Sequence, residues 1–191
     1  TQGVSSAASD VYKRQDQRYT VGALVLSNFG RLPNLIVAGR PFGRRLAGQL
    51  EGNLAQAGEN AAIVPEKGSI ILLVATDAPL DARQLRRLSL RAGAGLARTG
   101  SVFGHGSGDI ALAFSTAYTV PQEAERPMPA IAMLHEARID PLFEAAAEVC
   151  EQAIIAALWR ADSVQGRDGH VRTAIRDAAP DWRQWLADTE F

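Results

Sequence analysis

The sequence predicts a layered α/β (α+β) domain, and three features carry that prediction. Apolar, β-branched runs at residues 19–26 and 69–76 alternate with helical patterns such as residues 81–98. A length of 191 residues with 47% hydrophobic and 21% charged residues is typical of one globular domain with a sizeable core. The longest unbroken apolar run, residues 70–75, is too short to cross a bilayer.

The charge balance and the cysteine count exclude several function classes. Twenty Lys and Arg residues against 21 Asp and Glu residues give a net charge of −1, so we expect no nucleic-acid or membrane partner. The first 15 residues lack the apolar core of a secretory signal, which makes the cytoplasm the default location. The single cysteine excludes an internal disulfide, and the three histidines share no close spacing, so we expect no metal site.

The first third of the chain predicts a lead, a group of strands and a long loop. Residues 1–18 show no usable periodicity and are interpreted as a disordered or non-native lead. Residues 19–26 and 34–38 predict two neighbouring strands, and residues 41–46 are a candidate third strand. Residues 47–67 are rich in Gly, Asn and Ala, which favours a long loop.

The middle of the chain predicts a strand–helix–strand unit. The continuous apolar run at 69–76 favours a strand buried on both faces. A helix over 81–98 buries one face and exposes four arginines: the buried face holds Leu85, Leu88, Ala92 and Leu96, and the exposed one Arg83, Arg86, Arg87 and Arg91. A glycine-rich turn at 100–108 leads to a strand at 110–115.

A second long helix is expected to open at Asp140-Pro141, because an acidic cap followed by proline is a helix-start signal. Its apolar stripe is a candidate part of the core: Leu142, Phe143, Ala146, Val149, Cys150, Ala153, Ile154, Ala157 and Leu158. The tail from Gly166 is polar, with a possible short helix that carries Trp182 and Trp185.

Gly68-Ser69 is the first candidate for chemistry. A hydroxyl at the head of a strand, after a small residue and a long loop, suits self-cleavage in which Ser69 attacks the Gly68 carbonyl. The released α-amine, with a reference pKa of about 7.7–8.0, would then act as base for its own hydroxyl. On these two residues alone, a simple turn into a strand is the favoured interpretation.

The segment 104–109 (GHGSGD) is the second candidate. Ser107 and Asp109 stand at i and i+2, so on a strand they would share one face, although a solvated turn explains the same residues. No dinucleotide fingerprint and no G-x-S-x-G elbow is present. Asn28, just after a strand, is a candidate oxyanion donor or a turn residue.

The remaining reactive side chains favour structural roles. Cys150 falls on the apolar stripe of a helix and is interpreted as a buried thiol. His105 is interpreted as a loop residue, and His135 and His170 as surface residues.

Four stretches together resemble the self-processing aminopeptidases of the DmpA and β-peptidyl aminopeptidase family. They are VGALVLSNFGRLPNLIVAGRPFGRRL at 21–46, GSIILLVATDAPLDARQLRRLSLRAGAGLARTG at 68–100, GHGSGDIALAFSTA at 104–117 and GRDGH at 166–170. The resemblance implies a four-layer αββα sandwich, incomplete here. It also implies cleavage between Gly68 and Ser69, with Ser69 as N-terminal nucleophile, Ser107 and Asp109 as the pair that polarises it, and Asn28 as oxyanion donor.

The resemblance further implies a domain over 19–191, in which 19–68 end the first chain and 69–191 form the second. The family's first chain is much longer than the 68 residues found here, so we expect a truncated member with an exposed sheet face and a tendency to aggregate. The late helix reads IAAL at 155–158, where the family tends to have Asn before Ala-Leu, which affects a structural contact.

Three functions stay open at this stage. The leading hypothesis is a hydrolase that releases N-terminal residues from short peptides, amides or esters. The intact parent would need no metal or organic cofactor and would form a homo-oligomer. Ornithine-type acyl transfer on the same fold is the second, although that branch processes before Thr. An inactive fragment with a role only in assembly is the third.

Overall fold

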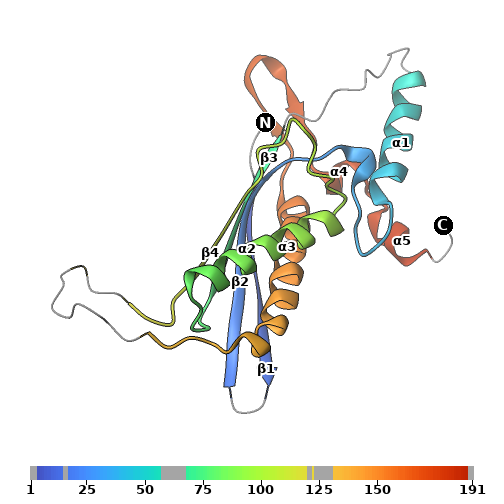
Figure 1. Cartoon of the computed structure of the whole chain (residues 1–191). Helices are drawn as coiled ribbons and strands as arrows, with labels where there is room; N and C mark the ends of the chain where they lie inside the picture. The colour runs from blue at the N-terminus through green and yellow to red at the C-terminus, as the bar shows by residue number, and fades with distance from the viewer. Residues whose placement is uncertain (1–3, 15–16, 57–67, 120–121, 123–130, 189–191) are drawn as a thin grey trace.

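The computed structural model describes residues 4–14, 17–56, 68–119, 122 and 131–188. Its centre is a four-stranded sheet in the order β1-β2-β3-β4 (Figure 1). Strand β2 runs antiparallel to both of its neighbours, β1 and β3, and β4 runs parallel to β3. The strands are β1 (Val4–Arg14), β2 (Gln17–Asn28), β3 (Ser69–Thr76) and β4 (Ile110–Ser115).

Two helices, α2 (Ala82–Arg98) and α3 (Asp140–Arg160), cover one face of this sheet and form the main core with it. Alternate residues of β2 and β3 enter that core: Val21, Ala23, Val25, Ile70, Leu72 and Val74. The opposite face is open, with Leu24, Ile71 and Leu112 between 42% and 56% exposed. The prediction that 69–76 is buried on both faces is therefore wrong for this chain, because helices cover only one of them.

Helix α2 begins as expected, because Asp81 caps it. The Asp81 side chain accepts a hydrogen bond from the Gln84 amide, and the Gln84 side chain accepts one from the Asp81 amide. On the side of α2 that faces the sheet, Leu88, Ala92 and Leu96 are fully buried.

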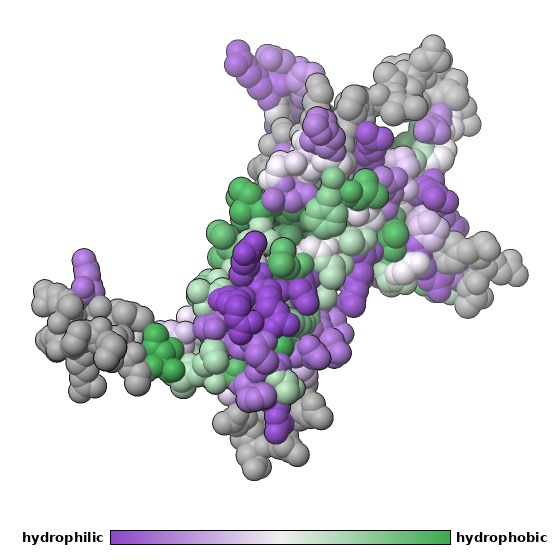
Figure 2. All heavy atoms as spheres, viewed as in Figure 1, coloured by the Kyte–Doolittle hydropathy of each residue, from purple (hydrophilic) through white to green (hydrophobic). Residues whose placement is uncertain are grey.

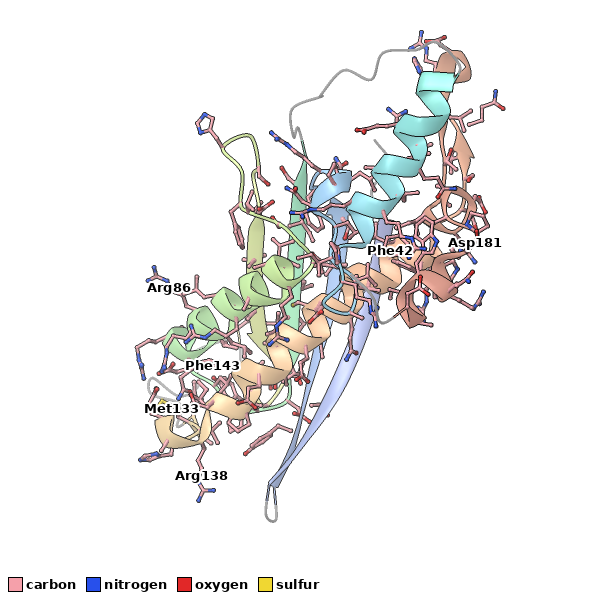
Figure 3. All side chains as sticks on the ribbon, turned by 90° about the vertical axis from the view of Figure 1, so that its right-hand side faces the viewer. Phe42, Arg86, Met133, Arg138, Phe143 and Asp181 are labelled. Carbon is pink, nitrogen blue, oxygen red and sulfur yellow. The ribbon has the colours of Figure 1, made fainter. Side chains whose placement is uncertain are left out.

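The arginines of α2 form a hydrophilic patch on the outer surface (Figure 2). Arg83 and Arg87 form ion pairs with Glu136, and their hydrogen bonds hold the pKa of that carboxyl below its usual range. The Arg87 and Arg91 guanidinium groups lie over the Phe143 ring of α3, so these two are less solvated than predicted. Figure 3 shows Arg86 projecting away from the helix.

Helix α3 spans the region expected from its apolar stripe, with Pro141 in its first turn. Its cap is Ile139 rather than Asp140, which is already helical. Cys150 is fully buried, and burial raises the pKa of its thiol to about 12, so it stays neutral. The interpretation of Cys150 as a structural thiol is confirmed.

The N-terminal segment differs from its prediction as a disordered lead. Residues 4–14 form β1, which pairs with β2 in one continuous register from Val4↔Ser27 to Arg14↔Gln17. The two strands of this hairpin follow each other in the sequence and are joined by backbone hydrogen bonds. Backbone pairing leaves no mark in the pattern of side chains, so the sequence of residues 4–14 did not predict a strand.

The segment 34–46 also departs from its prediction as two strands. A 3-10 turn, η1 (Leu32–Asn34), begins around Pro33, and Ala38 and Gly39 adopt positive φ angles of 51° and 74° in a tight turn. Helix α1 (Phe42–Gln56) follows, so the first ten residues of the predicted 47–67 loop are helical and residues 57–67 lie outside the described residues.

A second, smaller hydrophobic core lies between α1 and the segment 175–186. Phe42 stacks edge-on against Trp159, with ring centroids 5.5 Å apart, and lies 5.3 Å from Trp185. The elements after α3 are β5 (Val164–Gln165), η3 (Arg167–Gly169), β6 (Val171–Arg172), α4 (Ile175–Ala178) and α5 (Trp182–Ala187). The predicted short helix with Trp182 and Trp185 is α5, and η2 (Glu136–Arg138) precedes α3.

The predicted α/β class is confirmed: one sheet layer and one helical layer, half of a four-layer sandwich, are present in the described residues. Among those residues, no helix is both long and apolar enough to cross a membrane.

Candidate active site

Ser69 is the first residue of β3, and the register places it opposite Asn28, the last residue of β2. Residues opposite each other in an antiparallel pair point to the same face, and by alternation with Ile71 this is the open face. Gly68 is required by close approach, because a Cβ there would lie 2.0 Å from the Asn28 carbonyl oxygen.

The glycine-rich segment meets the start of β3. The Gly108 amide donates a hydrogen bond to Ser69 Oγ at 2.9 Å, although the two residues are 39 positions apart. A Cβ at Gly108 would lie 3.2 Å from that same oxygen, so glycine permits the approach. This contact brings the first and second candidate motifs into one site.

Asp109 links the glycine-rich segment to the start of β3. Its Oδ1 accepts a 2.5 Å hydrogen bond from Ser107 Oγ and a 3.2 Å bond from the Ile70 amide. A carboxylate that accepts two such bonds is held in a fixed position next to the nucleophile candidate. Ser107 and Asp109 are both half-buried, so these bonds are partly screened from water.

Chain topology explains why these residues meet. Strands β3 and β4 are parallel and joined through α2, so their first residues lie at the same edge of the sheet. Ser69 opens β3, and the Ser107–Asp109 segment directly precedes β4. The convergence predicted from the sequence is therefore produced by one β-α-β connection.

Two expected contacts are absent between these described residues. Ser69 Oγ is bound by the Gly108 amide and not by the Ser107 hydroxyl, and the Asn28 side chain makes no hydrogen bond to Ser69 or Asp109. Sequence reasoning missed the two backbone donors, Gly108 and Ile70. The three alternating glycines signal close backbone approach but not which amide makes it.

The histidines lie away from this centre of contacts. His105 is exposed in a turn, and the exposed His135 accepts a hydrogen bond from the Ala137 amide. His170 is exposed beside β6, so the surface and loop interpretations of all three are confirmed. Within the described ranges, no group of three or more His, Cys, Asp or Glu residues is placed to hold a metal ion.

The arrangement has the parts of a hydroxyl-based acyl-transfer site. Ser69 supplies a hydroxyl beside a backbone N–H donor, Asp109 supplies a fixed carboxylate, and Asn28 stands across the strand pair. All of them lie at one edge of the sheet on its open side, where a substrate would have access.

Sequence comparison defines the class. The family model described as Peptidase family S58 matches residues 2–172. The chain belongs to this peptidase family.

Individual relatives fit that membership. The curated β-peptidyl aminopeptidase BapA of Sphingosinicella microcystinivorans is 40% identical over 172 residues, which are 88% of this chain and 43% of that protein. The chain thus spans less than half the length of the curated relatives it matches.

Two solved structures share the fold. The PH0078 protein of Pyrococcus horikoshii OT3 matches with a TM-score of 0.79 and 43% identity, over 97% of this chain and 46% of that one. The L-aminopeptidase D-Ala-esterase/amidase of Ochrobactrum anthropi matches with a TM-score of 0.76 and 30% identity, over 95% of this chain and 48% of that one. The latter is described as a variant of the Ntn hydrolase fold, which supports the predicted fold class.

Proposed function

We propose that this chain is the part of a self-processing serine aminopeptidase that carries the nucleophile, and that the intact parent releases N-terminal residues from short peptides, amides or esters. The single observation that carries the proposal is the contact between Ser69 and the Ser107–Asp109 segment in a member of Peptidase family S58. A Gly-Ser turn without function would not require these distant segments to meet.

The processing step would begin at Gly68-Ser69. Ser69 Oγ attacks the Gly68 carbonyl carbon, the Gly68–Ser69 C–N bond breaks, and the Ser69 nitrogen takes up the hydroxyl proton as it becomes an amine. Water then hydrolyses the resulting Gly68 ester, which yields a Gly68 carboxylate and a free Ser69 N-terminus. The new amine has a reference pKa of about 7.7–8.0 and serves as base for the Ser69 hydroxyl.

In the mature enzyme, Ser69 Oγ would attack the substrate carbonyl carbon, and its hydroxyl proton would pass to the α-amine. The C–N bond of an amide, or the C–O bond of an ester, would then break, and the amine or alcohol would leave with that proton, which leaves an acyl-enzyme on Ser69. The Gly108 amide, which lies beside Ser69 Oγ, and Asn28 would donate to the developing oxyanion, while Asp109 would fix Ser107 and the β3 backbone. Water then releases the acyl group. The proposed roles of Ser69, Ser107, Asp109 and Asn28 need no metal or organic cofactor.

The domain boundaries follow from the same proposal. Residues 19–68 would end the first chain and 69–191 would form the second. Because curated relatives are more than twice as long, we propose that the rest of the parent supplies a second sheet over the open face. Short peptides or amides are the proposed substrates, and a homo-oligomer is the proposed state of the parent.

Intact-mass spectrometry and N-terminal sequencing of the parent protein test the proposal. A second chain that begins at Ser69 is expected, and Ser69→Ala should leave the precursor uncut. The matched control is Ser115→Ala at the far end of β4, which should still process. A wild-type parent that stays uncut, or is cut elsewhere, would contradict the proposal.

An activity assay separates the two enzymatic hypotheses. The processed parent should release the amine from amino-acid p-nitroanilides, and Ser107→Ala and Asp109→Asn should lower kcat by at least about tenfold. Transfer of acetyl groups from N-acetylornithine to glutamate without amidase activity would favour the acyltransferase.

A further inference from the structure

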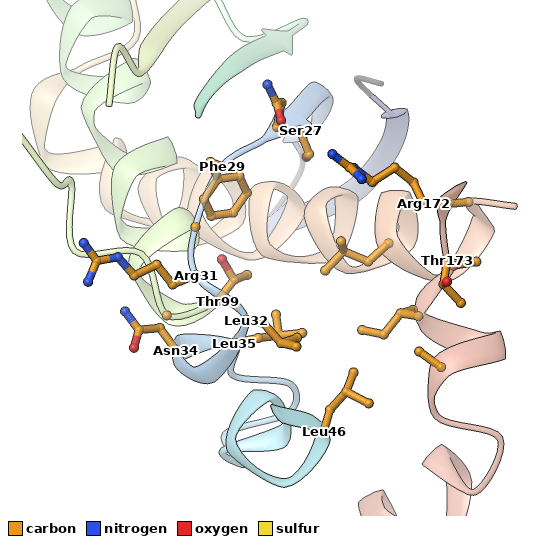
Figure 4. Close-up of a pocket in the computed structure, with 18 of the residues that line it drawn as sticks. Ser27, Phe29, Arg31, Leu32, Asn34, Leu35, Leu46, Thr99, Arg172 and Thr173 are labelled. Atoms are coloured by element: carbon orange, nitrogen blue, oxygen red, sulfur yellow. The ribbon is translucent and has the colours of Figure 1, made fainter. Parts of the chain in front are cut away.

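A cavity of about 530 Å³ lies beside the end of β2, next to Ser27 and Asn28 (Figure 4). It is bounded by the end of β2 with its following loop, by α1, by the turn after α2 and by the chain from the end of α3 to α4. Of the candidate active-site residues, Asn28 lines the cavity, whereas Gly68, Ser69, Ser107 and Asp109 do not. Its volume is in the range of small-molecule sites.

Most of the cavity wall is apolar. The apolar lining includes two leucines of α1 and residues from three other places along the chain: Leu46 and Leu50, with Leu35, Leu158 and Ile175. A pocket of this kind gains affinity from any apolar group that leaves water to fill it.

One end of the cavity carries a buried hydroxyl group without a hydrogen-bond partner among the described residues. Ser27 is 9% exposed, lines the cavity, and its Oγ has no hydrogen-bond partner among the described residues. By alternation with Val25, Ser27 points to the helix-covered side and not toward Ser69. A buried hydroxyl without a partner costs free energy, which a ligand oxygen at this position would recover.

A cation stands near that polar end. Arg172 lines the cavity, and Figure 4 shows its side chain extending from the opposite wall toward Ser27. Its printed hydrogen bond goes to the neighbouring Val171 carbonyl at 3.3 Å, and it forms no ion pair within the described part of the chain. Asp162 is the acidic residue among the described lining residues, and it forms an ion pair with Arg176 at 3.1 Å.

We propose that this cavity binds the carboxylate of an apolar carboxylic acid, with the carboxylate between Ser27 and Arg172 and the apolar body against the leucines. Arg172 supplies the opposite charge and Ser27 donates a hydrogen bond to the carboxylate. A free organic acid and the C-terminus of an apolar peptide present the same chemistry. The site does not depend on the proposed function of Ser69.

Ligand-observed NMR on the 191-residue chain at low micromolar concentration tests this with 4-phenylbutyrate and its neutral isostere 4-phenylbutanamide. The acid should bind at least about tenfold more tightly than the amide, because only the acid pairs with Arg172. Arg172→Gln should remove this preference. The matched control Arg167→Gln, on the same hairpin and outside the cavity lining, should keep it.

Ser27→Ala separates binding from structure. It should weaken binding of the acid several-fold, yet raise the urea midpoint of the free protein, because it removes an unpartnered buried hydroxyl. Ser69→Ala should leave binding unchanged. A tripeptide with a free C-terminal Phe, compared with its amidated form, shows whether peptide C-termini are accepted as well as free acids.

Several results would overturn the proposal. These are equal binding of acid and amide, no saturable binding at millimolar concentration, or loss of binding in Ser69→Ala. Unchanged acid preference in a folded Arg172→Gln variant would do the same, and Ser27→Ala decides the matter if that variant does not fold.

Discussion

The helix-covered face and the open face of the sheet are built from alternate residues of the same strands. On β3, Leu72 is 1% exposed under the helices, whereas the neighbouring Ile71 is 42% exposed on the other side. Both are large aliphatic residues, so side-chain chemistry does not separate the faces. What separates them is whether another layer of the fold covers them.

The candidate site follows the same division. Ser69 and Asn28 belong to the open face by register, and the Ser107–Asp109 segment meets them at its edge. The helix-covered face holds the core that positions this edge, and Ser27, which lines the cavity, points to that side. We therefore expect substitutions on the covered face to change stability, and those on the open face to change association or chemistry.

Leu72→Ala is expected to have the largest effect. It removes a fully buried side chain from the covered face and should lower the free energy of unfolding by about 2–5 kcal/mol. Leu24→Ala is the control on the open face, where Leu24 is 47% exposed, and should cost less than about 1 kcal/mol. Urea denaturation measures both. Equal losses would mean that the open face is covered in solution.

Gly68→Ala tests the close approach between the backbone before β3 and the end of β2. Its Cβ would lie 2.0 Å from the Asn28 carbonyl oxygen, and backbone on both sides must move to relieve that contact. A loss of about 1–3 kcal/mol in unfolding free energy is expected. Gly48→Ala in α1, where nothing lies within 4 Å, should instead stabilise by about 0.5–1 kcal/mol. If both substitutions are neutral, the close approach at Gly68 is wrong.

Self-association of the 191-residue chain should depend on the open face. Leu112 and Phe114 are 56% and 42% exposed on β4, and burying them between copies would drive association. Replacing both with Thr should raise the concentration at which the chain associates about tenfold, as measured by analytical ultracentrifugation. The control is Leu90→Ala, at a 63% exposed position on α2, which should leave association unchanged. A monodisperse wild-type monomer would contradict this prediction.

The sequence predicted the elements whose buried residues form a clear hydrophobic pattern along the chain. The stripe at Leu88, Ala92 and Leu96 located α2, and the continuous run at 69–76 located β3. Residues 41–46 were misassigned as a strand, although Phe42 and Leu46 are both buried at helical spacing. A short apolar run does not distinguish the two periods.

The site was predicted only in part, because half of its contacts involve the backbone. Side-chain types and spacing made Ser69, Ser107 and Asp109 candidates beside a simple turn, and only the resemblance gave them their roles. The parallel strands bring them together. The amides of Gly108 and Ile70 carry no side-chain signal, since every residue except proline has the same donor. The resemblance supplied the order of the motifs, which local patterns alone do not contain.

The smallest expected effect is a pH dependence of the unfolding free energy that arises from Glu136, which pairs with arginines on the outer side of α2. Hydrogen bonds from Arg83 and also from Gln84 and Arg87 lower the pKa of Glu136. A carboxyl with a lowered folded-state pKa stabilises the protein fully above its ordinary pKa of about 4.3, and loses that contribution as the pH falls through the folded-state value. Wild type should therefore be slightly more stable than Glu136→Gln at pH 7, with the difference fading below about pH 4. Urea titrations from pH 7 to about pH 3 measure it, with Glu148→Gln, at an exposed position of α3, as control. A difference that persists unchanged at the acidic end would show that Glu136 acts through packing and not through its charge.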